Sequence, residues 1–171
     1  MRYLMSSSIR FRPMSSLAGY AALLLCLLLV LPSPVWAASP VNTLKRGLIR
    51  DSDTGVAING YDPVAYFTEH KPVPGKPTLR HSWNGAQWQF ASQQHLDLFE
   101  AAPEQYAPQF GGYCAYGVAQ GYLVSIEPEQ FTIIDGKLYL NYSADVQKKW
   151  TQDPAGYNAK AKAAFASLLA K

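Results

Sequence analysis

The feature that most constrains the fold is a segment that occurs twice, with equivalent residues 51 positions apart. The first copy begins with Trp83-Asn-Gly and the second with Ile134-Asp-Gly, and each continues as an aromatic-rich stretch. Asn-Gly and Asp-Gly are the dipeptides that close two-residue β-hairpins. We therefore expect two copies of one hairpin-plus-helix unit, over residues 83–106 and 134–157.

The two copies also agree beyond the hairpin. Each predicted strand ends at a Ser, whose hydroxyl can accept a hydrogen bond from the first turn of a following helix. The matched positions are Ser92 and Ser143, Phe99 and Trp150, Pro103 and Pro154, and Tyr106 and Tyr157. These matches predict helices over residues 93–101 and 144–152, with Phe99 and Trp150 at corresponding places in the core.

The rest of the chain predicts one small domain of the α+β class. Residues 38–58 are expected to form an N-terminal lead-in that is partly helical, and residues 59–171 the domain itself. Three prolines make residues 71–77 a loop, because proline cannot donate a backbone hydrogen bond. An alanine-rich stretch over residues 160–169 predicts a C-terminal helix.

Residues 1–37 have the pattern of a secretory signal peptide. Three arginines precede an apolar run from Ala21 to Leu31, and Val35-Trp-Ala37 places short side chains where a signal peptidase cleaves. The run is shorter than the ~20 residues that a membrane-spanning helix needs. We expect cleavage near Ala37, a periplasmic or secreted protein, and no stable membrane insertion after processing. An uncleaved N-terminal anchor is the alternative.

Removal of this leader changes the charge and the cysteine content. The chain holds 15 Lys and Arg against 12 Asp and Glu, and three of the basic residues lie in the leader, so the rest is balanced. Nucleic acid is not an expected partner, because phosphates are bound by basic surfaces. Of the two cysteines only Cys114 lies beyond the leader, so no intramolecular disulfide can form there.

Several ordered motifs resemble the YHS domain family. They are Gly60-Tyr-Asp-Pro-Val-Ala-Tyr-Phe67, Arg80-His-Ser82, Trp88-Gln-Phe-Ala-Ser92, and Leu98-Phe99 followed by Pro103-Glu-Gln-Tyr106. Residues 111–117 and the second copy are similar to a longer, exported bacterial branch of that family. The resemblance implies a treble-clef-like architecture, a metal-binding module and no enzymatic activity.

The sequence departs from the cysteine-bearing members of that family at the positions of their thiols. It has Ala65, Ala91 and His95 there, so only His95 keeps a group that binds metal. A tetrahedral zinc site made of thiolates is therefore not available. Any metal site must be assembled from His81, His95 and Cys114, with Tyr or Asp oxygens as further ligands.

The predicted metal site consists of Cys114 and His95, with His81 as the third group. His95 is the third residue after Ser92, where the helix dipole favours the neutral imidazole that binds metal. A thiolate with one or two imidazoles suits a copper ion, or a zinc ion with water completing the shell. The alternatives are an inward-packed His95 and a hydrogen-bonded or exposed His81.

The surroundings of Cys114 suggest a second kind of site. Gly111 and Gly112 precede it and allow a strained loop, and Tyr113 and Tyr116 flank it and can stack on a small ligand. The same residues also suit a tight packing turn with an inert thiol and two core tyrosines.

Three classes of function are consistent with these residues. The first is an exported module that binds a metal or a small ligand. The second is a thiol enzyme in which Cys114 uses His95 as its base, although no known local signature is present. The third is a partner-binding scaffold without a site. We predict the first, and we assign no catalytic residue.

Overall fold

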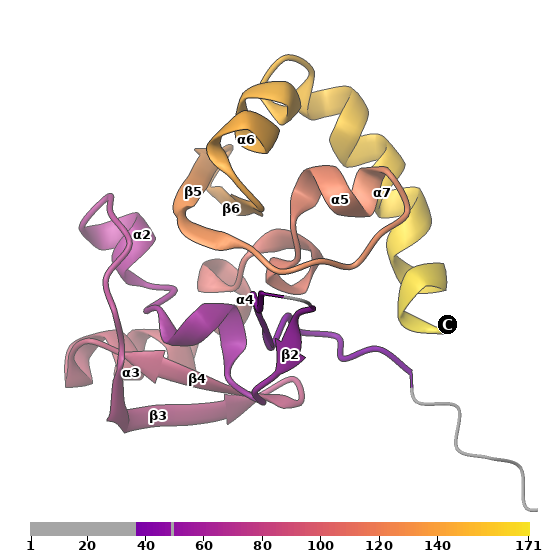
Figure 1. The fold of residues 1–171 in the computed structure, drawn as a ribbon. Helices are drawn as coiled ribbons and strands as arrows, with labels where there is room; N and C mark the ends of the chain where they lie inside the picture. Colours follow the sequence, from indigo (N-terminus) through magenta and orange to yellow (C-terminus); the bar gives the residue numbers. More distant parts are fainter. Residues whose placement is uncertain (1–36, 49) are drawn as a thin grey trace, which may run out of the picture. The chain divides into compact units, whose positions relative to one another are not determined.

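The computed structural model describes residues 37–48 and 50–171, so all of the predicted signal peptide except Ala37 lies outside the described residues. Within the described residues, no helix is long and apolar enough to cross a membrane. The fold is α+β, as predicted. This part of the chain forms three separate two-stranded antiparallel sheets, with helices between and after them (Figure 1).

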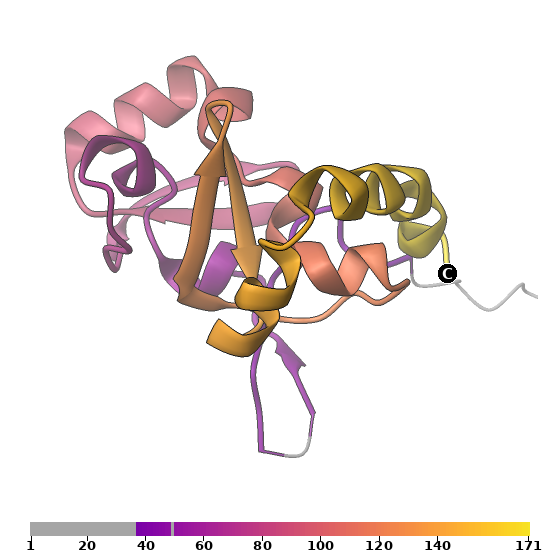
Figure 2. The same cartoon turned by 90° about the horizontal axis from the view of Figure 1, so that it is seen from above.

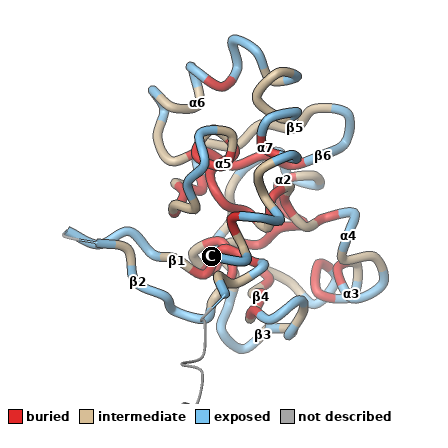
Figure 3. The backbone as a smooth tube through the Cα atoms, turned by 90° about the vertical axis from the view of Figure 1, so that its right-hand side faces the viewer, coloured by how far each residue is buried: buried red, intermediate tan, exposed pale blue. Residues whose placement is uncertain are grey.

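The N-terminal lead-in is a hairpin rather than a partly helical segment. Strands β1 (Leu44–Lys45) and β2 (Ser52–Asp53) pair with each other, and the hairpin projects from the rest of the ribbon (Figure 2). Most of its residues are exposed (Figure 3). The hairpin is fixed at its base, where the hydroxyl of Thr43 donates to the Asp53 carboxylate at 2.7 Å. The antiparallel pairing of β1 with β2 takes the place of the backbone hydrogen bonds that a helix would form.

The first predicted unit has the expected elements. Strands β3 (Lys76–Trp83) and β4 (Ala86–Phe90) form a hairpin, and helices α3 (Gln93–Ala101) and α4 (Pro103–Tyr106) follow. The bounds of α3 are those predicted. Its N-cap is Ser92, whose hydroxyl accepts from the backbone N–H of His95 at 3.2 Å.

The second predicted unit has the same order of elements. Strands β5 (Glu127–Ile134) and β6 (Lys137–Asn141) are followed by α6 (Ala144–Trp150) and α7 (Pro154–Leu169). Helix α6 is two residues shorter than predicted. The C-terminal helix begins at Pro154 rather than residue 160, because the Asp153 carboxylate caps it by accepting from the Gly156 N–H at 2.9 Å.

The two hairpins share their register as well as their order. Lys76 pairs with Phe90 in the first hairpin, and Glu127 pairs with Asn141 in the second, each 51 residues later. Both ladders then shift register before Arg80 and before Phe131, which are again equivalent positions. An insertion at the same place in both hairpins supports the internal repeat more strongly than the aligned residues alone.

The repeat begins earlier than the sequence indicated. The short 3-10 helices Ala57–Gly60 (η1) and Gln109–Gly112 (η2) both carry two successive non-helical residues with positive φ. Each is followed by a short helix, α2 (Ala65–Thr68) or α5 (Ala115–Ala119). Equivalent residues here lie 52 positions apart instead of 51. We call residues 57–106 the first half and residues 109–157 the second half.

Corresponding aromatic residues lie in the core of each half. Phe99 is fully buried against Trp88, with ring centroids 5.1 Å apart and planes inclined by 34°. Trp150 is fully buried against Tyr139, at 5.0 Å and 37°. The predicted equivalence of Phe99 and Trp150 is therefore confirmed, although the two residues belong to different hydrophobic clusters.

Candidate functional site

The three residues of the predicted metal site have separate surroundings. Cys114 contacts Asn141 and Gly117, whereas His95 and His81 each form a bond with a carboxylate of their own. Among the described residues, no group of three or more His, Cys, Asp and Glu side chains is placed to hold a metal ion. The arrangement therefore does not fit the predicted copper or zinc centre of Cys114, His95 and His81.

His95 is held by a buried carboxylate. Its Nδ1 lies 2.7 Å from Oδ2 of Asp62, a residue with no exposed surface. An ionised carboxylate can only accept, so Nδ1 donates this bond. The other ring nitrogen, Nε2, lies 3.2 Å from the hydroxyl of Thr68. Both nitrogens thus have partners, and neither faces a place for a metal ion.

Backbone N–H groups complete the surroundings of Asp62. Its Oδ1 accepts from Val64 at 2.8 Å and from Ala65 at 3.3 Å, and its Oδ2 accepts from Ala91 at 2.8 Å. Asp62 therefore connects the start of α2 to the residue that follows β4. Three N–H donors and one imidazole offset the cost of burying this charge.

His81 lies at a different place, on strand β3. Its Nδ1 is 2.9 Å from Oε1 of Glu100 on α3, and about a third of its side chain is exposed. This contact links the hairpin to the helix that follows it. The hydrogen-bonding role that the sequence left open as an alternative for His81 is the one observed.

Cys114 occupies the N-cap position of α5. The residue is 1% exposed, and its sulfur accepts from the Gly117 N–H at 3.3 Å. Burial raises the pKa of the Cys114 thiol, and hydrogen bonds from the backbone of Gly117, Tyr142 and Tyr116 oppose that rise. The net effect is a thiol that stays protonated at neutral pH, within reach of three donors that would stabilise negative charge.

Cys114 is the counterpart of Asp62. The residues whose N–H groups surround Asp62 are Val64, Ala65 and Ala91, and their counterparts are Tyr116, Gly117 and Tyr142. The backbone N–H of each central residue also bonds to an equivalent carbonyl, Val73 for Asp62 and Val124 for Cys114. The two halves therefore place a carboxylate and a thiol in the same backbone setting.

An apolar pocket of about 180 Å³ lies beside Cys114. It is lined by Cys114, Tyr116, Gly117, Val124, Tyr142 and Val146. Val146 is the counterpart of His95, and Cys114 is the counterpart of Asp62. Both Cys114 and Val146 line the pocket, whereas Asp62 and His95 are bonded to each other in the first half.

The two tyrosines that flank Cys114 have different roles. Tyr116 lines the pocket and packs against Tyr157, with ring centroids 5.1 Å apart. Tyr113 is buried elsewhere and its hydroxyl donates to the carbonyl of Ser39 at 2.9 Å. Burial raises the pKa of Tyr113 to about 12. Of the two, only Tyr116 is placed to stack on a ligand next to Cys114.

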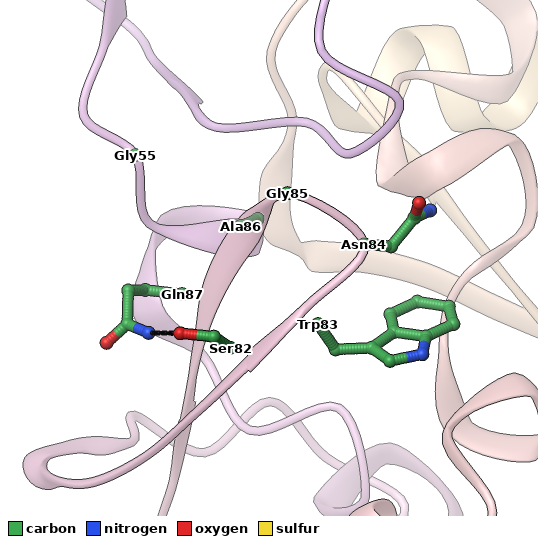
Figure 4. A pocket seen from close by; sticks show the side chains of 7 residues that line it. All are labelled: Gly55, Ser82, Trp83, Asn84, Gly85, Ala86 and Gln87. Carbon is green, nitrogen blue, oxygen red and sulfur yellow. Dashed lines mark hydrogen bonds between the residues drawn. The ribbon is translucent and has the colours of Figure 1, made fainter.

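A second hollow lies at the turn of the β3–β4 hairpin. Figure 4 shows its lining, where the side-chain amide of Gln87 donates to the hydroxyl of Ser82 and the Trp83 ring lies on the opposite side. Its residues are Gly55, Ser82, Trp83, Asn84, Gly85, Ala86 and Gln87, and none of them is ionisable. This hollow offers no thiol, carboxylate or imidazole, so the Cys114 pocket is the stronger candidate.

Sequence reasoning found Cys114 and Tyr116 but missed the role of Asp62 and the pocket that Cys114 and Val146 line. A signal was present. Gly60-Tyr-Asp62 and Gly112-Tyr-Cys114 align, but at a spacing of 52 residues rather than 51. The one-residue difference lies in the loops after α2 and α5, and it concealed the correspondence.

Comparison with known proteins gives one match. No curated protein and no solved structure matches this chain. The family model of the YHS domain matches residues 64–110, which cover most of the first half and the beginning of the second. This agrees with the family that the motifs indicated, while the exported bacterial branch remains an expectation. Residues 64–110 of this chain are therefore similar to a YHS domain.

Proposed function

We propose that this protein is an exported, non-catalytic module that binds a small ligand in the pocket beside Cys114. The observation that carries the proposal is the difference between the halves. In the first half a ring occupies the space beside the central residue, and in the second half a pocket of about 180 Å³ lies beside it. Apolar pockets with a few placed polar groups are the usual form of small-ligand sites.

An organic ligand is better supported than a copper or zinc ion. Copper and zinc need several N or S donors around one point. In the part of the chain that the structure describes, Cys114 lines the pocket without a second such side chain. A metal bound to purified protein at a ratio of one to one, and lost in Cys114→Ser, would contradict this choice; native mass spectrometry is the measurement.

The thiol-enzyme alternative lacks its base. The N–H at Nδ1 of His95 donates to Asp62, and Nε2 lies beside the Thr68 hydroxyl. Both partners belong to the first half, whereas Cys114 lies in the second half. A catalytic thiol also needs a lowered pKa, and burial raises that of Cys114. These contacts support a binding role over a catalytic one.

Benzene is a suitable probe of the pocket. An engineered apolar cavity of roughly 150 Å³ in another protein binds benzene, so a pocket of this size has room for it. We expect benzene to raise the Tm of the purified protein, and Val146→Phe to abolish the rise by occupying the pocket. Lys148→Ala, an exposed change on the same helix, is the control and should leave the rise intact. An unsubstituted protein whose Tm does not respond to benzene would refute the proposed site.

The exported location is a separate part of the proposal. It rests on the apolar run and the short side chains that end at Ala37. We expect the intact mass of the protein recovered from outside the cytoplasm to correspond to a chain that begins near Ala38. A mass that still includes Trp36 would favour the uncleaved anchor.

A further inference from the structure

A larger hollow, of about 580 Å³, is lined by the turn of the β5–β6 hairpin and by the N-terminal part of α7. We call it the hairpin–helix hollow. It shares no residue with the pocket beside Cys114, so the two places are separate. Its volume is within the usual range of small-molecule sites.

One wall of this hollow is a single face of α7. Four residues of the helix line it at the spacing i, i+3, i+4 and i+7, which places side chains on one side of a helix. They are Ala155, Asn158, Ala159 and Lys162. The two alanines have short side chains and leave the space open, while the other two residues bring polar groups to it. Because Oδ1 of Asn158 is buried, its Nδ2, a donor, is the polar side-chain atom that a ligand can reach.

A second wall is the turn of the β5–β6 hairpin. Ile134 and Lys137 form the pair that closes this hairpin, and both line the hollow. Their counterparts in the first half are Trp83 and Ala86. The ring of Trp83 packs against Trp88, with centroids 5.9 Å apart. The second hairpin thus brings a cation and a short apolar side chain to its turn, where the first brings an aromatic ring.

The charged groups around the hollow leave one positive charge in excess. Lys137 and Lys162 are cations, and Asp135 at the turn is an anion. Within the described residues, none of the three forms an ion pair with another side chain. Two cations against one anion complement a ligand with a single negative charge, and the carboxylate of Asp135 disfavours a ligand with two.

Apolar side chains make up much of the remaining lining. Ile134 and Pro154 line the hollow together with the alanines of α7, and the buried Tyr139 lines it as well. Such walls are stabilised when an apolar group covers them and displaces water. A bare inorganic anion would leave this surface uncovered and would lose its own hydration. The lining therefore favours an anion that is joined to an apolar group.

We propose that the hairpin–helix hollow binds a small organic acid with one carboxylate and a compact apolar body. The carboxylate lies between the ammonium groups of Lys137 and Lys162 and accepts from Nδ2 of Asn158. The apolar body covers Ile134 and the alanines of α7. This inference goes beyond the proposed function, because it concerns a second binding place and a ligand of defined charge.

The test compares benzoate with benzamide, a neutral molecule of nearly the same shape, by chemical-shift titration of the purified protein at neutral pH. We expect benzoate to bind more tightly. Lys137→Gln and Lys162→Gln should each weaken benzoate binding about fivefold, the effect of losing one partly exposed charge pair, and benzamide binding less than about twofold. Lys160→Gln is the matched control, because it removes the same charge from α7 outside the hollow. Equal binding of the two probes, or a preference for benzoate that survives either substitution in the hollow unchanged, would overturn the proposal.

Two further variants establish where benzoate binds. Ala159→Phe places a large ring on the face of α7 that lines the hollow and should abolish benzoate binding. Val146→Phe fills the pocket beside Cys114 and should leave benzoate binding unchanged. Loss of benzoate binding in Val146→Phe alone would assign the ligand to the Cys114 pocket, which overturns this proposal and leaves the proposed function in place. Inorganic phosphate that binds as tightly as benzoate would also overturn it, because the apolar body would then contribute nothing.

Discussion

The first half fills the space beside its central residue with its own side chain, whereas the second half leaves the space open. Both halves use the same turn with positive φ, the same short helix and the same hairpin register. They differ in a pair of positions. Asp62 with His95 makes a closed, hydrogen-bonded pair, and Cys114 with Val146 makes a pocket.

That difference shows that the same backbone setting can hold two different side chains. The N–H groups that surround Asp62 or Cys114 belong to the backbone, so they point at this position whichever side chain stands there. A carboxylate beside them requires a partner in the protein interior, and His95 supplies it. A neutral thiol requires none, so its neighbour is free to be small. The closed pair of the first half is therefore expected to contribute to stability, and the pocket of the second half is the proposed binding site.

The largest expected effects come from the aromatic residues that the halves share. Phe99→Ala and Trp150→Ala should each lower the free energy of unfolding by about 3–5 kcal/mol, because both side chains are fully buried. Urea denaturation measures the loss. Exposed Leu48→Ala is the control and should change stability little. A loss below about 1 kcal/mol for either core variant would show that the halves are not packed in equivalent ways.

The next effect separates the two central residues. Asp62→Ala should cost about 3 kcal/mol, because it strands three backbone N–H groups and the His95 ring. Cys114→Ala should cost only about 1 kcal/mol, since it removes a small apolar group with weak hydrogen bonds. Chemical denaturation of both variants makes the comparison. Equal losses would contradict the proposed division into a structural half and a binding half.

Smaller effects are expected at the helix caps. Ser92→Ala and Ser143→Ala each remove one bond to a first-turn N–H, at 3.2 Å and 3.4 Å respectively, and should each cost about 1 kcal/mol. Thermal unfolding of the two variants, with Ser→Asp at each position as a capping control, checks the prediction. Aspartate should retain most of the stability because it also accepts this bond. A loss of stability in only one of the two Ser→Ala variants would show that the two caps are not equivalent.

The smallest effect depends on pH. Burial raises the pKa of the folded Cys114 thiol above its ordinary value of 9.0, so the unfolded chain loses this proton first. The stability from the protonated thiol is complete below pH 9 and is lost as the pH rises through the folded pKa. The unsubstituted protein should therefore lose stability faster above pH 9 than Cys114→Ala, by at most about 1.4 kcal/mol per pH unit.

The tyrosines do not disturb that comparison. Burial also raises the pKa of Tyr66, Tyr113 and Tyr139, so both proteins lose stability at high pH for this shared reason. Only the difference between the two slopes reports on Cys114. Parallel slopes would mean that the thiol titrates alike in the folded and unfolded chains, and that its burial is less complete than the structure indicates.

Much of the fold was predictable because its signals are local. Asn-Gly and Asp-Gly fix the two hairpin turns, and the serines after each hairpin fix where α3 and α6 begin. The end of α6 and the start of α7 were misplaced, because the Asp153 cap was overlooked. The hairpin of the lead-in was also missed, since two-residue strands leave almost no pattern.

The candidate site was only partly predictable. The sequence drew attention to Cys114 and Tyr116, which do line the pocket. It also suggested that Cys114, His95 and His81 come together, on the ground that they carry the metal-binding groups of the mature chain. The structure instead gives each a partner from its own surroundings: Asn141, Asp62 and Glu100. Chemical type alone does not determine which side chains meet.

The sequence by itself determined the two-copy plan, the two repeated hairpins, the starts of α3 and α6 and the matched aromatic residues, since each depends on residues close together in the chain. Tertiary structure decided which half is filled and which is open. Residues 33 positions apart form the Asp62–His95 pair, and Cys114 and Val146 stand at a similar distance along the chain. Whether such a pair closes or leaves a pocket depends on side-chain length across the packed interior. That property exists only once the hairpin, the turn and the helix have come together.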